Sequence, residues 1–238
     1  MVAASFQRPH DLRRGQCIAQ TDRQIPQPAL EPDAPDRAAL QALRRETGIS
    51  YDHLERGILH IHTEVREFEA AHERVALMQA HGCAMQLKSA IECLGIEPAL
   101  ANSRIGIIGG TYEPADESGD AHMFTRALAA RAADAGAEFH YETSVESLHV
   151  DGAEVQGISV RGPDGQAVTM QANTVVVAMG SYTPLLLEKI GIRVPVYPVK
   201  GYSITILLES PEAAPTVCLT DENAKIAMSR LGNRLRAA

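Results

Sequence analysis

Apolar residues recur at helical spacing in three stretches of the chain. The stretches cover residues 37–48, 64–82 and 120–136, and each ends in a glycine, namely Gly48, Gly82 and Gly136. Apolar positions three to four residues apart form one face of a helix, and glycine is common just after a helix ends. Three amphipathic helices are therefore predicted, with Thr63 and Asp120 as the N-caps of the second and third. Residues 89–92 (Ser-Ala-Ile-Glu) have capping-box spacing and predict a further short helix.

Strand patterns occupy much of the remaining sequence. Residues 57–63 alternate, with Ile58, His60 and His62 on one side and Leu59 and Ile61 on the other. Residues 154–170 read as a hairpin that turns at Gly-Pro-Asp-Gly, and residues 194–208 predict another strand. The run "NTVVVAMGSYT", residues 173–183, is continuously apolar up to Gly180, which is typical of a buried parallel strand. Helices mixed with such strands predict an α/β fold of mixed α+β character.

Composition limits the classes of protein and partner. The 238 residues are 45% hydrophobic, enough for one large or two small domains. The net charge of −8 argues against nucleic acid as a partner. Cysteines 17, 83, 93 and 218 have neither zinc-site nor disulfide-scaffold spacing, which indicates a cytoplasmic protein with buried thiols at positions 83, 93 and 218. No apolar run reaches transmembrane length, and peripheral contact with the inner membrane stays open.

The glycine-rich stretch "GIIGG", residues 106–110, resembles a phosphate-binding turn only superficially. The dinucleotide fingerprint is G-x-G-x-x-G, followed directly by a helix. Here the spacing is G-x-x-G-G, and Pro114 with several acidic residues follows. A turn is therefore predicted at this place, and no other stretch of the chain fits the fingerprint.

Several longer stretches together resemble one enzyme family. They include "GGTYEPADESGDAHMFTRALA", "VVVAMGSYTPLLL", "VPVYPVKGYSITI" and "DENAKIAMSRLGNRLRA". In combination they resemble the D-amino acid oxidase-like, FAD-dependent oxidoreductases, and among these the small subunit of bacterial D-amino acid dehydrogenases. The resemblance covers about residues 38–236.

The resemblance implies a partial FAD-binding, Rossmann-like domain interleaved with a substrate domain built on a mixed or antiparallel sheet. Residues 38–112 and 183–238 match the substrate domain, and residues 113–182 match the FAD-binding domain. Residues 1–37, rich in Pro, Arg and Gln, are expected to form a poorly ordered tail outside the family. Because family members begin with the G-x-G-x-x-G unit and continue beyond the last strand seen here, a truncated, internal piece of the enzyme is expected.

The implied reaction, part of amino acid catabolism, is oxidative deamination of a D-amino acid to a 2-oxo acid, with electrons leaving through a quinone. Five residues match positions beside FAD: Val145, Ala178, Gly180, Ser181 and Tyr182. Lys200, Gly201 and Tyr202 match the stretch near the flavin and the substrate, where a lysine would stabilise negative charge on the reduced ring. Each of these residues also has a purely structural interpretation. Val145 would be a core residue, Ala178, Gly180 and Ser181 would pack at the end of a strand, and Lys200 would be a surface side chain. No catalytic residue is identified.

Two other interpretations stay open. One is a catalytically inactive product that only associates with other chains, including copies of itself, through an exposed sheet edge. The other is a related amine or imino-acid dehydrogenase acting on glycine, sarcosine or proline. No metal site is predicted, because His60 and His62 lack a third ligand.

Overall fold

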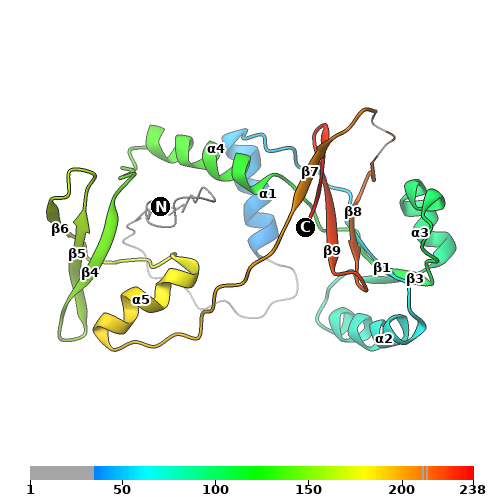
Figure 1. Cartoon of the computed structure of the whole chain (residues 1–238), viewed down its shortest axis with the longest axis horizontal. Helices are drawn as coiled ribbons and strands as arrows, with labels where there is room; N and C mark the ends of the chain where they lie inside the picture. Colours follow the sequence, from blue (N-terminus) through cyan, green and yellow to red (C-terminus); the bar gives the residue numbers. More distant parts are fainter. Residues whose placement is uncertain (1–34, 211, 213) are drawn as a thin grey trace. The chain divides into compact units, whose positions relative to one another are not determined.

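The computed structural model describes residues 35–210, 212 and 214–238 (Figure 1). The described chain forms two compact units. The larger unit runs up to Phe124 and resumes at Gly201, and the smaller unit spans residues 125–200. The chain therefore passes between units at positions 124/125 and 200/201, whereas the sequence predicted domain boundaries at 112/113 and 182/183. The predicted tail, residues 1–37, lies almost wholly outside the described residues.

A seven-stranded mixed sheet forms the larger unit, in the order β2-β3-β1-β8-β9-β10-β7. Its only parallel pair in the described chain is β1 with β8, and all other neighbours are antiparallel. The strands are β1 (Ile58–His62), β2 (Gln86–Ser89), β3 (Gly109–Glu113), β7 (Ile204–Leu207), β8 (Cys218–Asp221), β9 (Ile226–Leu231) and β10 (Arg234–Ala237). The "GIIGG" stretch thus leads into a strand in this sheet.

Helices α2 (Val65–Ala80) and α3 (Ala90–Ile96) pack against strands β1 and β3, as Figure 1 shows. The short helix η1 (Pro98–Asn102) follows α3. The capping box is confirmed, since the Glu92 N–H bonds to Ser89 Oγ and the Ser89 N–H to Glu92 Oε2. The N-cap predicted for α2 was wrong: Glu64 occupies that position, and the Thr63 N–H bonds instead to Asn223 Oδ1 at 3.1 Å.

Leu59 and Ile61 of β1 form the main core of the larger unit together with Cys93, Leu100 and Leu219. Burial raises the pKa of the Cys93 thiol to about 11, so this cysteine is an inert apolar side chain. Cys218 is also buried, as predicted, whereas Cys83 is only partly buried and Cys17 lies outside the described residues.

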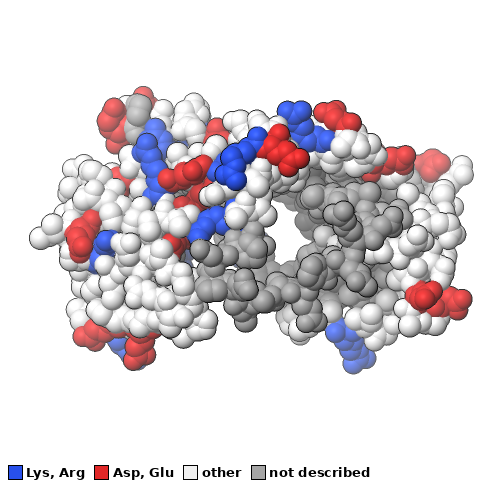
Figure 2. Space-filling view, turned by 180° about the vertical axis from the view of Figure 1, so that it is seen from behind, with Lys and Arg blue, Asp and Glu red and all other residues white. Residues whose placement is uncertain are grey.

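Helix α1 (Pro35–Thr47) is held to the loop before α4 by charged groups. Arg44 contacts both Glu117 and Glu55, and Gln41 Nε2 bonds to Glu117 Oε1 at 2.8 Å. Figure 2 shows Lys and Arg side chains interspersed with Asp and Glu on one face of the molecule. Paired opposite charges thus fix α1 in the larger unit.

The smaller unit contains the antiparallel sheet β4-β5-β6 and most of helix α4. Its elements are α4 (Ala121–Asp134), β4 (Ser144–Asp151), β5 (Glu154–Arg161), β6 (Ala167–Gln171), η2 (Gly180–Tyr182), α5 (Thr183–Leu187) and η3 (Glu188–Ile190). Asp120 caps α4 and residues 154–170 form a hairpin, both as predicted. Leu148, Ile158, Val160 and Leu186 are the buried centre of its core, where α5 packs against β4 (Figure 1).

Two predicted strands differ from the structure. Residues 174–179 carry no strand pairing, although their apolar pattern predicted a buried parallel strand. A strand exists only through backbone bonds to a neighbour, and the described smaller unit offers no parallel neighbour to this segment. The strand predicted for residues 194–208 is confined to β7, because the prolines at 195 and 198 remove the backbone donors that a longer ladder would need.

Candidate functional site

The segment Ala178–Tyr182 turns from an extended stretch into helix α5. Gly180 has a φ of +53°, a left-handed conformation that favours glycine, and the three residues from Gly180 to Tyr182 form η2. Pro184 stands in the first turn of α5, where a missing N–H costs nothing. A β-carbon added at Gly180 would meet no atom within 4 Å. The backbone at Gly180 is therefore open to an approaching ligand.

Alternate residues before this turn point to opposite sides. Val175, Val177 and Met179 pack against the core of the smaller unit, while Val176 and Ala178 are exposed. Val145 of β4 packs into the same core. The structure thus brings Val145 and the 178–182 segment together in one unit. Val145 serves there as a packing residue, and Ala178 and Gly180 form the accessible side.

Lys200, Gly201 and Tyr202 lie outside any helix or strand, just before β7. Lys200 is the last residue of the smaller unit and Gly201 the first of the returning larger unit. All three are exposed, and Tyr202 is 80% exposed. Tyr202 is therefore not a core residue of the described chain.

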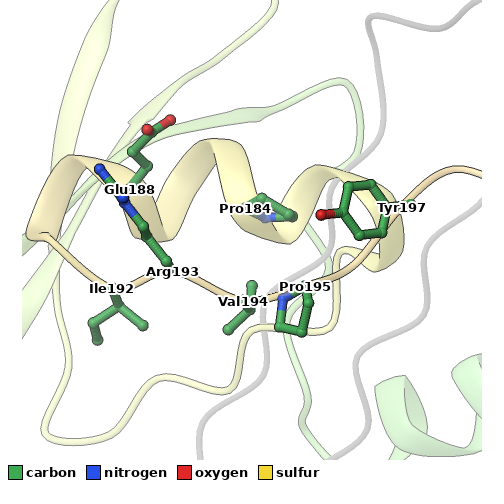
Figure 3. Close-up of a pocket in the computed structure, with 7 residues that line it drawn as sticks. All are labelled: Pro184, Glu188, Ile192, Arg193, Val194, Pro195 and Tyr197. Atoms are coloured by element: carbon green, nitrogen blue, oxygen red, sulfur yellow. The ribbon is translucent and has the colours of Figure 1, made fainter.

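A pocket of about 410 Å³ lies in the smaller unit, and its residues were not singled out from the sequence. Figure 3 shows it between helix α5, which continues into η3, and the segment 192–197 that returns beneath the helix. The chain reverses at Gly191, whose φ of +78° is the left-handed end of η3. The lining residues are Pro184, Glu188, Ile192, Arg193, Val194, Pro195 and Tyr197. Apolar walls with one acid, one base and a phenol suit a small amphipathic molecule.

A second pocket, of about 220 Å³, lies in the larger unit between α1 and the start of α4. Tyr51 and Phe124 supply its aromatic walls, with their rings 5.1 Å apart in an edge-to-face arrangement. Glu117 also lines it. Burial raises the pKa of Glu117, but hydrogen bonds from Arg44 and Gln41 outweigh that effect and leave the pKa below its usual value. Glu117 is thus an ionised carboxylate committed to Arg44.

His60 and His62 lie on the same side of β1 but in different surroundings. His60 Nδ1 is 2.7 Å from Glu222 Oε1. His62 is only 1% exposed and packs beside Phe68, and neither ring nitrogen has a hydrogen-bond partner among the described residues. No group of three ligating side chains suited to a metal ion occurs among the described residues. A membrane-crossing helix is likewise not found in the described part of the chain.

Comparison with known proteins decides the family. The profile of the FAD dependent oxidoreductase family, DAO, matches residues 15–238. The chain belongs to this family. The match begins well before residue 38, so residues 15–37, which the sequence alone placed outside the family, lie inside it.

Two curated relatives carry the name D-amino acid dehydrogenase. The chain is 50% identical over 202 residues to "D-amino acid dehydrogenase" of Dechloromonas aromatica, covering 85% of this chain and 48% of that protein. It is 46% identical to the protein of the same name from Paramagnetospirillum magneticum, covering 85% and 47%. The chain spans about half the length of the curated relatives that it matches.

Solved structures agree on the fold. Glycine oxidase from Geobacillus kaustophilus superposes with a TM-score of 0.71 at 28% identity, over 87% of this chain and 53% of that one. L-proline dehydrogenase from P. horikoshii also gives a TM-score of 0.71, at 16% identity, over 92% and 57%. The mixed α/β fold of an FAD-dependent oxidoreductase is thus confirmed.

The residues present fit one side of an FAD site. The open backbone at Gly180 and the exposed side of Ala178 can lie against a flat cofactor without a clash. Negative charge on a pyrophosphate needs a glycine-rich turn at a helix N-terminus, and the sequence holds no such motif. Residues 178–182 therefore fit one wall of an FAD site, whereas a turn that would bind the FAD pyrophosphate is not found in this sequence.

Proposed function

We propose that this protein takes part in the FAD-dependent oxidation of D-amino acids to 2-oxo acids. The observation that carries the proposal is the 50% identity over 202 residues to a D-amino acid dehydrogenase. Identity at this level extends through both compact units, so it includes the segment 178–182 as well as the sheet that carries β7. A shared name among relatives with 40–50% identity favours the D-amino acid over other amines.

Bound FAD would supply the acceptor for the hydride that leaves the amino acid Cα. The role of the chain's own residues is to bind the cofactor and to orient it. Gly180 and Ala178 present backbone and a small side chain to the cofactor, and Ser181 offers a hydroxyl at the same turn. The core around Val145 and Leu186 supports this turn from behind and fixes its position. Rigid support of a binding segment is what keeps two reactants in a productive arrangement.

Lys200 is the cationic residue of the segment that leads into β7. Its ammonium group would stabilise negative charge that develops on a reduced cofactor. Tyr202, 80% exposed in this chain, would face the amino acid substrate. Loss of a hydride from Cα and of a proton from the amino group, two electrons and two protons in all, gives the imino acid, which water hydrolyses to the 2-oxo acid and ammonia.

We further propose a quinone, rather than oxygen, as the electron acceptor. The support is the name dehydrogenase among the curated relatives. Steady-state assays test substrate and acceptor together. The purified protein with added FAD is given D-alanine, and reduction of a soluble quinone, formation of pyruvate and formation of hydrogen peroxide are measured. Quinone reduction and pyruvate in equal amounts, without peroxide, are expected.

A second candidate reaction is oxidation of glycine or an imino acid, favoured by the structural likeness to glycine oxidase at 28% identity. Glycine, sarcosine and L-proline in the same assay distinguish the two. Faster turnover of any of these than of D-alanine would replace the proposed substrate. No turnover of any substrate would favour the catalytically inactive product.

A further inference from the structure

Strand β7 is an edge strand of the seven-stranded sheet. Among the residues that the structure describes, it pairs with β10 on one side only, and its sequence is Ile-Thr-Ile-Leu. Its apolar side chains are open to solvent, with Ile204 67%, Ile206 52% and Leu207 73% exposed. Proteins usually protect such edges with lysine, proline or a bulge. The opposite edge, β2, is polar and includes Lys88, whereas β7 carries no charge.

The pairing with β10 shows which backbone groups of β7 remain available. Leu207 lies opposite Arg234, so Leu208 lies opposite Asn233, and the Leu208 N–H bonds to the Asn233 oxygen at 2.9 Å. Hydrogen-bonded pairs alternate along an antiparallel ladder. Ile206 and Ile204 therefore direct their N–H and C=O groups to β10. Thr205 and Leu207 direct theirs to the free edge.

This alternation makes the free edge complementary to itself. If two copies meet antiparallel about a twofold axis at Thr205, the Thr205 residues face each other as a hydrogen-bonded pair. Leu207 then bonds with Ser203 of the second copy, and Ile204 lies opposite the second copy's Ile206. Isoleucines in a non-hydrogen-bonded pair approach closely and bury apolar surface. Every outward backbone group of β7 finds a partner in this register.

We propose that β7 is a self-association surface, through which two copies of this chain join their sheets in the order β10-β7-β7-β10. The arrangement is isologous, as in most homodimers. A four-residue strand buries less than the roughly 1,000 Å² of a stable interface, so the dimer is weak and depends on concentration. This association is independent of the proposed reaction.

Sedimentation velocity across a concentration series tests the proposal, with two double variants that change the same two positions. Ile204→Lys with Ile206→Lys places lysine opposite lysine across the twofold axis. Ile204→Lys with Ile206→Glu places lysine opposite glutamate. The first variant is expected to raise the dissociation constant at least tenfold, and the second to bring it back to within threefold of the unmodified chain. Far-UV circular dichroism checks that both variants fold.

Thr205→Pro provides a second test, because it removes only an outward N–H while β10 keeps its bonds to Ile204 and Ile206. It is expected to abolish dimers at concentrations where the unmodified chain forms them. A chain that is monomeric at every concentration would overturn the proposal. So would association that the double-lysine variant leaves unchanged.

Discussion

Asp120 accepts hydrogen bonds in two directions. Its Oδ1 caps α4 by accepting from the N–H groups of His122 and Met123, and its Oδ2 lies 2.9 Å from Arg234 Nη2. Arg234 also contacts Asp52 at 3.2 Å. One carboxylate thus connects the start of α4 to strand β10, and both lie in the larger unit.

Replacement of Asp120 by alanine is expected to lower the free energy of unfolding by about 1–2 kcal/mol, the usual cost of losing an N-cap. Asp120→Asn keeps a capping oxygen and should lose about half as much, because asparagine caps well but forms no ion pair. Urea unfolding measures both. Glu69→Ala, on the exposed side of α2, is the control and should leave the stability unchanged. Equal losses in the alanine and asparagine variants would argue against a capping role.

His62 gives the stability an acid-sensitive component. Burial lowers the pKa of His62, and the nearby Arg74 lowers it further against the smaller opposite effects of Glu222 and Glu67. The unfolded chain therefore binds a proton near pH 6.5 that the folded chain accepts only at lower pH. The associated stability is fully present above about pH 6.5 and is lost as pH falls below it.

His62→Leu is expected to flatten the dependence of stability on pH between about 7 and 5, since leucine cannot bind a proton. It should also leave the stability at pH 7.5 unchanged or higher, because two buried nitrogens without partners are removed. Urea unfolding at pH 7.5 and at about pH 5 measures the stability of the variant and of the unmodified chain. His81→Gln, at an exposed position, is the control and should keep the original slope. An unchanged slope in His62→Leu would contradict the assignment.

At the scale of elements, Glu97 joins η1 to the start of β8. Its side chain is only 1% exposed, and Oε2 accepts from the Thr216 and Val217 N–H groups and from the Thr216 hydroxyl. Oε1 accepts from the Ala99 N–H. A buried carboxylate thus fixes two segments 119 residues apart.

Glu97→Ala is expected to cost about 3 kcal/mol or more, because it leaves several buried donors without an acceptor. Glu97→Gln keeps one acceptor oxygen and should cost less. Thermal unfolding of the unmodified chain and of the two variants gives the order of their stabilities. A glutamine variant as unstable as the alanine variant would mean that a charge, and not an acceptor, is required.

Local patterns predicted some elements correctly and others not. The capping box of Ser89 and Glu92 and the hairpin of residues 154–170 depend on residues that are close in sequence. The sequence alone therefore predicted both. Residues 174–179 depend on a distant pairing partner, which no local pattern reveals. Of the candidate site, the sequence singled out Gly180 as the end of an apolar stretch, whereas the pocket beneath α5 depends on how residues 192–197 fold back.

Backbone amides of residues 174–179 are expected to exchange with deuterium much faster than those of β5, because they have no ladder partner. Hydrogen–deuterium exchange with mass spectrometry of the chain compares the two segments. Equal protection would show that residues 174–179 are paired after all. β6, at the edge of its sheet, serves as the comparison for a paired but exposed strand.

At the scale of the whole molecule, the chain alternates between two units: the first part of the larger one, then the smaller one, then the larger one again. The turn at Gly180, which is proposed to face FAD, belongs to the smaller unit and the β7 sheet to the larger one. The core of each unit is built from its own strands and helices.

The central claim is tested most directly by the visible spectrum of the FAD-loaded protein under anaerobic conditions, before and after D-alanine is added. D-alanine is expected to bleach the visible absorbance of the bound flavin, and L-alanine is expected to leave it unchanged. An FAD-loaded protein that neither enantiomer bleaches, or that L-alanine bleaches equally, would contradict the account.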